Sequence, residues 1–178
     1  KISADGNKVW ENSYGGAETD RVFSLVKATD GNYILSGESR SINGDVSNSK
    51  GGGDIWLVKF NASNGAIIWE KSYGGTEFDT SRGITKLEND YYAIAGSARS
   101  SDIDVAANYG ANDAWLILID ENGNWEFEKN VGGSDIDFAN QVIGTNKNEI
   151  IVVGSSFSND GDILINNGNK DVLIFKMK

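Results

Sequence analysis

The chain has 178 residues, 26 of them acidic and 16 basic, and it contains neither cysteine nor histidine. Its net charge of −10 argues against nucleic-acid binding, which needs a basic surface, and against anionic membranes for the same reason. The missing Cys and His exclude thiolate and imidazole chemistry, so any metal site must use oxygen ligands, as Ca²⁺ and Mg²⁺ do. No apolar run approaches the ~20 residues of a membrane-spanning helix, and we expect no membrane insertion.

One pattern recurs three times along the chain. Its glycine pairs are Gly15-Gly16, Gly74-Gly75 and Gly132-Gly133, at offsets of 59 and 58 residues. An Asp follows four residues after each pair, at Asp20, Asp79 and Asp137. These matches predict a single repeat domain, 1–178, with units of approximately 1–59, 60–118 and 119–178.

Each unit reads as four antiparallel β-strands, without helical periodicity. The elements of the second unit are, in order, a strand at 66–73, a strand at 80–87, a turn at 88–90, a strand at 91–98, a loop at about 100–112 and a strand at 114–119. In the first unit, Ile55-Trp56-Leu57-Val58 is apolar on consecutive residues, which places hydrophobic groups on both faces of its sheet. Such a strand lies between two other layers.

The predicted fold class is therefore all-β, a β-propeller-type repeat of three four-stranded antiparallel blades. A β-solenoid coil is too short for this period, and a twelve-stranded sandwich does not explain the repetition. Propellers typically have 4–8 blades, so three blades do not close a ring. The chain opens in mid-pattern at Lys1, as expected of a processed or excised piece. We expect the ring to be completed by self-association with a partner chain or by further repeats.

The units resemble the bacterial β-propeller repeats of the SBBP type. The residues that carry the resemblance are Ser13-Tyr14-Gly15-Gly16, Asp20, Gly31-Asn32-Tyr33-Ile34-Leu35-Ser36-Gly37, Ser39-Arg40-Ser41 and Asp54-Ile55-Trp56-Leu57-Val58-Lys59. The third unit departs most, with Val131 for Tyr, Leu173 for Trp and Lys147-Asn148-Glu149 for the Gly-Asn turn. The resemblance implies an exported, secreted or cell-surface bacterial protein in which the propeller is an interaction or scaffold module.

Acidic residues recur in the long loop and at the start of the fourth strand of every unit. The candidate calcium ligands are Asp45, Asp54, Asp104, Asp113, Asp162 and Asp171. Carboxylates from a turn and a strand end can begin a Ca²⁺ site. The alternative is that these side chains bond backbone N–H groups in the turns.

Four residues are candidates for ligand binding. Trp10 and Trp69 lie on a more polar strand and offer one aromatic ring per unit, as a sugar-binding propeller would, while Arg40 and Arg99 offer polar contacts. The alternative is that the two arginines are ordinary loop residues.

We therefore expect a non-enzymatic module that binds a protein or another ligand through the loops 42–53, 101–112 and 159–170. A multivalent carbohydrate-binding propeller is the alternative, and a polysaccharide-acting hydrolase or lyase is the second alternative. Enzyme activity is disfavoured, because an active site needs unlike groups converging once whereas these Asp residues repeat in every unit. No catalytic residue is predicted.

Overall fold

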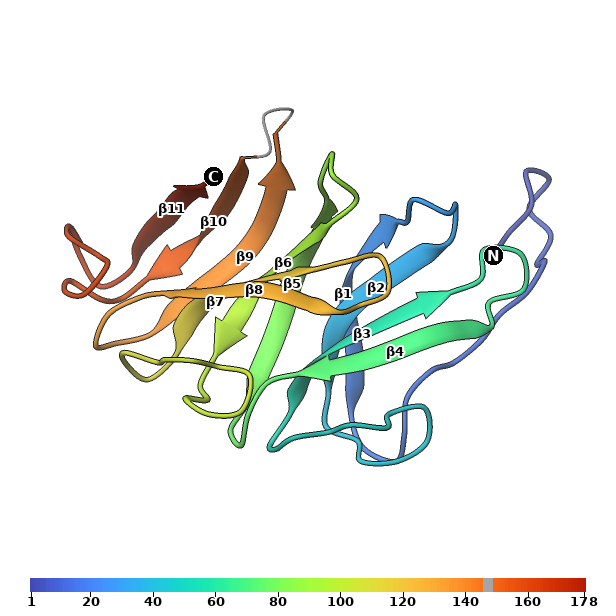
Figure 1. Cartoon of the computed structure of the whole chain (residues 1–178), viewed down its shortest axis with the longest axis horizontal. Helices are drawn as coiled ribbons and strands as arrows, with labels where there is room; N and C mark the ends of the chain where they lie inside the picture. Colours follow the sequence, from blue (N-terminus) through green and yellow to red (C-terminus); the bar gives the residue numbers. More distant parts are fainter. Residues whose placement is uncertain (146–148) are drawn as a thin grey trace.

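The computed structural model describes residues 1–145 and 149–178, and its regular elements are β-strands (Figure 1). The turn that the sequence places at Lys147-Asn148-Glu149 falls largely outside the described residues. The described residues include no helix that is long and apolar enough to cross a membrane.

The strands form three antiparallel sheets, which confirms the predicted all-β class with repeated sheets. The first sheet consists of β1 (Asp20–Lys27), β2 (Tyr33–Ser39), β3 (Asp54–Phe60) and β4 (Ile67–Tyr73). The second consists of β5 (Asp79–Lys86), β6 (Tyr92–Ala98), β7 (Asp113–Ile119) and β8 (Trp125–Val131). The third consists of β9 (Asp137–Gly144), β10 (Ile150–Ser156) and β11 (Asp171–Met177). The described residues thus give the third sheet three strands where the repeat predicts four, and the row of sheets does not close into a ring.

The strands are grouped differently from the sequence repeats. β4, which the repeat places at the start of the second unit, pairs with β3 of the first sheet, with Leu57 opposite Lys71. A short turn joins the two strands, closed by a 2.8 Å bond from Asn61 N to the carbonyl of Ala66. Gly65 adopts φ +74° in this turn, a conformation that glycine tolerates best. β8 pairs with β7 in the same way, so the strand before a Gly-Gly pair completes the preceding sheet.

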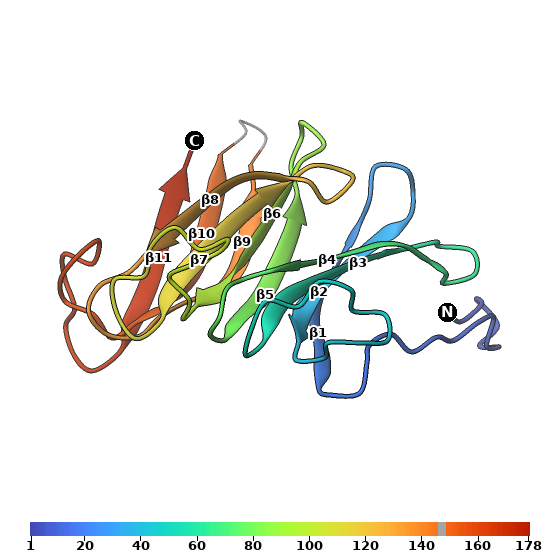
Figure 2. The same cartoon turned by 60° about the horizontal axis from the view of Figure 1, so that its bottom comes forward.

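The sheets stand side by side in a row, as both views show (Figures 1 and 2). The first strand of each following sheet makes the contact: β5 lies against β1, β2 and β3, and β9 lies against β5, β6 and β7. This succession of sheets, each stacked on its neighbours, is propeller-like.

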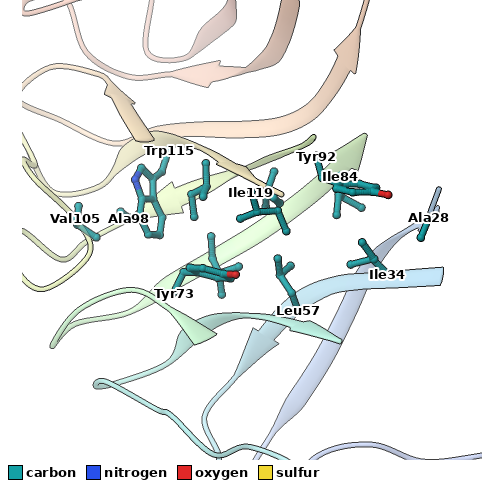
Figure 3. Close-up of a cluster of buried hydrophobic side chains, with 13 residues drawn as sticks. Ala28, Ile34, Leu57, Tyr73, Ile84, Tyr92, Ala98, Val105, Trp115 and Ile119 are labelled. Atoms are coloured by element: carbon teal, nitrogen blue, oxygen red, sulfur yellow. The ribbon is translucent and has the colours of Figure 1, made fainter. Parts of the chain in front are cut away.

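Apolar side chains fill the space between the sheets. Ile34 and Leu57 of the first sheet face Ile84, Tyr92 and Ile119 of the second, and all five are buried (Figure 3). A second cluster joins the other two sheets. In β3, four consecutive residues, Ile55-Trp56-Leu57-Val58, are all buried, which confirms that this strand is covered on both faces.

A buried lysine with two partly exposed carboxylate partners also links the first two sheets. The ammonium group of Lys59, at the end of β3, lies 2.5 Å from a carboxylate oxygen of Glu121 and 2.9 Å from one of Asp30. Burial by itself lowers the pKa of Lys59, but the bonds to Glu121 and Asp30 outweigh it and raise the pKa above its ordinary value. Lys59 therefore stays charged and joins the two sheets.

Candidate functional site

The Asp that follows each Gly-Gly pair accepts hydrogen bonds that stabilise the turn. Asp79 accepts hydrogen bonds from Gly75 N at 2.8 Å and from Ser100 Oγ at 2.7 Å. Asp137 repeats the arrangement with Gly133 N at 2.9 Å and Ser158 Oγ at 2.8 Å. The counterpart in the first unit, Asp20, accepts from Gly16 N at 2.8 Å and from Ser41 Oγ at 3.0 Å. These carboxylates fix the chain where it enters the first strand of each sheet.

The loop carboxylates among the predicted metal ligands bond to the same turns. Asp45 and Gly15 exchange two bonds, Gly15 N to Asp45 Oδ2 at 3.0 Å and Asp45 N to the Gly15 carbonyl at 2.9 Å. Asp104 forms the corresponding pair with Gly74 at 3.1 and 3.2 Å. Asp162 donates its N–H to the carbonyl of Gly132 at 2.9 Å. The long loop is thereby fastened to the Gly-Gly turn.

The carboxylates at the starts of β3 and β7 are buried and only half satisfied. Asp54 Oδ2 accepts from Lys50 N at 2.7 Å, and Asp113 Oδ2 accepts from Tyr109 N at 2.7 Å. The Oδ1 atom of each is buried without a hydrogen-bond partner. Burial raises the pKa of both, and burial together with the charges of Asp137 and Asp162 raises that of Asp113 to about 6.

Each unpaired oxygen points toward the next Gly-Gly turn. A Cβ atom at Gly74 would lie 2.5 Å from Asp54 Oδ1 and 2.7 Å from Asp79 Oδ2, and one at Gly132 would lie 2.4 Å from Asp113 Oδ1. No side chain larger than hydrogen fits there, which explains the invariant first glycine of the pair in these two units. Asp171, their counterpart in the third sheet, is only half-buried and accepts from Asn167 N at 2.5 Å.

The predicted calcium ligands thus take part in turn and loop hydrogen bonds. Across residues 1–145 and 149–178, no group of three or more acidic side chains is arranged to hold a metal ion. Calcium binding by these six Asp residues stays a prediction.

The four predicted ligand-binding residues do not line one common pocket among the described residues. The Trp10 ring packs edge-on against Phe60 at 5.9 Å, and Trp69 is half-buried against the core, with its indole N–H 3.3 Å from the Glu121 carbonyl. Arg40 is exposed and stacks over the ring of Phe78 at 4.9 Å. Arg99 is also exposed and lines a pocket of about 360 Å³ between the second and third sheets.

A larger pocket, of about 530 Å³, opens between the outer strands of the first two sheets. The side chains that line it include Lys50, Lys71, Ile103, Asp104, Trp125 and Glu128. The Trp125 ring, 36% exposed, lies 5.7 Å from the ring of Tyr73 and 6.0 Å from that of Trp115. The site therefore combines an aromatic surface with ammonium and carboxylate groups.

The charged groups of this pocket are partly engaged. Lys50 forms an ion pair with Asp104 and donates to the Ser72 carbonyl at 2.8 Å. Glu128 Oε2 accepts from the indole N–H of Trp115 at 2.7 Å. Lys50, Asp104 and Glu128 are thus held by bonds within the chain.

The backbone at the rim of the pocket is strained. Ile103 has φ +56°, where the other two loops have Gly44 at +70° and Gly161 at +63°. A β-branched residue rarely adopts this left-handed conformation. Its side chain is nevertheless 63% exposed, so packing inside the chain does not repay the strain. Backbone strain of this kind is typical of functional sites.

The sequence analysis included Ile103 only as part of the loop 101–112, and it named neither Lys71 nor Trp125. The signal for Trp125 is a difference between units, because it stands where the other units have Lys8 and Ile67. The pocket itself is formed by two sheets meeting, which no single repeat reveals. Comparison with known proteins adds no assignment: no family model matches the chain, and no curated protein is significantly similar to it.

Proposed function

We propose that the chain is a non-enzymatic binding module whose ligand occupies the pocket between β4 and β8. The observation that carries this proposal is the backbone conformation of Ile103, which is unfavourable for a β-branched residue and leaves an exposed apolar side chain at the rim of the pocket. The resemblance to SBBP-type repeats supports the placement of such a module in a secreted or cell-surface bacterial protein.

Binding is favoured over hydrolysis because the two carboxylates of the pocket already have partners within the chain. Asp104 is ion-paired with Lys50, and Glu128 holds the indole of Trp115. A glycosidase needs one carboxylic acid and one carboxylate placed on either side of the scissile bond.

A carbohydrate is the second candidate for the ligand. Trp125 is partly exposed and lines the same pocket as Asn124 and Lys71. Sugar rings pack their apolar face on an aromatic ring while their hydroxyl groups bond to such polar neighbours. Trp125 thus takes the place that the sequence suggested for Trp10 and Trp69.

The test is a titration of the ¹⁵N-labelled chain with soluble oligosaccharides and with short peptides, followed by NMR. We expect shifts at the Trp125 indole and at Ile103 with one of the two classes, and loss of them in Trp125→Ala. Phe127→Ala is the matched control, because this exposed aromatic on the same strand does not line the pocket. Shifts elsewhere, or none with any probe, would contradict the proposal.

A further inference from the structure

The four arginines of this acidic chain lie toward one end of the first two sheets. Arg21 and Arg82 are in the first half of β1 and β5, and Arg40 and Arg99 directly follow β2 and β6. Because these strands pair antiparallel, the start of one and the end of the next lie at the same end of the sheet. The guanidinium groups of the chain are thus gathered in one region of the fold.

In the first sheet, one of these arginines has an acidic partner. Glu38 lies opposite Arg21 in the ladder of β1 and β2 and is only 2% exposed. Its Oε1 accepts from Arg21 Nη1 at 3.3 Å, and its Oε2 accepts from the hydroxyl of Thr80, in the second sheet, at 2.8 Å. A carboxylate of the chain itself thus lies between the first and second sheets, with both oxygens hydrogen-bonded.

The second sheet repeats this arrangement without the acid. Ser97 stands at the position of Glu38 and lies opposite Thr80, which stands at the position of Arg21. Both side chains line the pocket of about 360 Å³ between the second and third sheets. Ser97 is 2% exposed, and its hydroxyl has no hydrogen bond to another residue of the described chain. A buried polar group without a partner at a pocket wall is a place for a ligand atom.

The charge of this pocket is positive. Arg82 and Arg99 line it, and none of its other lining residues is charged. Neither guanidinium group forms an ion pair with a described residue, and Arg82 instead stacks over the ring of Phe23 at 4.1 Å. In a chain of net charge −10, two arginines without an acid favour an anionic ligand. The planar fork of a guanidinium group matches a carboxylate.

The remaining walls of the pocket are largely apolar. Phe138 is the counterpart of Thr80 in the repeat, and it lines the pocket together with Phe78 and Ile136. Pockets of roughly 300–1,000 Å³ that combine apolar walls with a few polar groups are typical of small-molecule sites. A bare inorganic anion would leave these walls uncovered. An anion with an apolar body therefore fits better.

We propose that this pocket binds a small organic carboxylate. The anionic group takes the place that Glu38 fills between the first two sheets, and it accepts hydrogen bonds from Arg82, Arg99 and Ser97. The apolar body of the ligand lies against the phenylalanine rings. This pocket shares no lining residue with the one between β4 and β8, so it is a second site.

The first test is a calorimetric titration of the native chain with 3-phenylpropanoate. We expect saturable binding of one molecule per chain. The uncharged 3-phenylpropanamide should bind at least about tenfold more weakly, because the charge-assisted hydrogen bonds are lost. No binding of 3-phenylpropanoate, equal binding of acid and amide, or tighter binding of inorganic phosphate would overturn the proposal.

The second test locates the site with substitutions. Arg99→Gln, at an exposed position, should weaken binding of 3-phenylpropanoate at least about tenfold. Lys27→Gln is the matched control, because Lys27 is also exposed and carries the same charge but does not line the pocket, so binding should stay at the native level. Equal effects of the two substitutions would indicate a general charge effect and would overturn the site.

A third variant uses the chain's own carboxylate as a competitor. Ser97→Glu restores the residue type of Glu38 at this position and should abolish binding of 3-phenylpropanoate in a chain that still unfolds cooperatively. Unchanged binding in both Ser97→Glu and Arg99→Gln would contradict the proposal. Trp125→Ala should leave this binding unchanged, so the failure of this site and the failure of the proposed function are distinguishable.

Discussion

Asp113→Asn is expected to stabilise the protein above about pH 6. The Asp113 carboxyl is buried, has one oxygen unpaired and faces Asp137 across Gly132, and its pKa is raised from 3.8 to about 6. Each pKa unit corresponds to about 1.4 kcal/mol, so the full difference corresponds to about 3 kcal/mol. This is an upper value, because Asp137 shares the site.

The sign follows from proton linkage. Below about pH 4 Asp113 is protonated in both states and its ionisation costs nothing. Between about pH 4 and 6 the unfolded chain loses this proton first, so stability falls as the pH rises, and above about pH 6 the penalty is constant. Asn keeps an oxygen for Tyr109 N and carries no charge, so the penalty disappears.

The assay is urea unfolding from pH 4 to pH 8, followed by tryptophan fluorescence. The free energy of unfolding of Asp113→Asn minus that of the native chain should be near zero at pH 4 and rise to at most about 3 kcal/mol at pH 8. Asp171→Asn, at the half-buried counterpart, controls for the loss of one negative charge. A difference that does not change with pH, or a variant less stable at pH 8, would refute the reasoning.

Three further predictions concern other parts of the fold. Ile103→Gly should raise the free energy of unfolding, measured with urea, by about 0.5–1 kcal/mol. The substitution relieves ~1–2 kcal/mol of backbone strain, and the greater conformational entropy of glycine in the unfolded chain offsets ~0.5–1 kcal/mol of this. A loss of stability would contradict the strain at Ile103. Lys59→Ala should lower the free energy of unfolding by about 2 kcal/mol, because it removes the lysine that joins the first two sheets. Lys86→Ala breaks the exposed pair with Asp90 and should change the unfolding midpoint little. Equal effects of the two substitutions would count against a stabilising role of Lys59. Excess Ca²⁺ or EDTA should leave the melting temperature unchanged, because the carboxylates of Asp45 and Asp104 already accept from backbone N–H groups. A calcium-dependent rise would support the metal site instead.

The repeat allowed the sheet structure to be predicted, but not the grouping of its strands. The apolar runs at Ile55-Trp56-Leu57-Val58 predict burial on both faces, because hydrophobicity alone decides that. The sequence period has no marked beginning, so it does not tell whether β4 joins β3 or β5. The short turn at 61–66, closed around Gly65, decides for β3.

The candidate site was less predictable because it depends on two sheets meeting. The repeated Asp residues attract attention in the sequence, yet Asp20 and Asp79 are taken up by their own turns. Trp125 and Ile103 differ from their counterparts in the other units, but only the folded structure shows that they line the same pocket. Backbone strain at Ile103 cannot be read from residue type alone.

The grouping of strands across the repeat boundary forms the two walls of the pocket, and NMR cross-strand contacts test it most directly. We predict nuclear Overhauser effects between the backbones of β3 and β4, around Leu57 and Lys71, and between β7 and β8, around Leu116 and Lys129. Contacts that instead pair β4 with β5 and β8 with β9 would contradict this account.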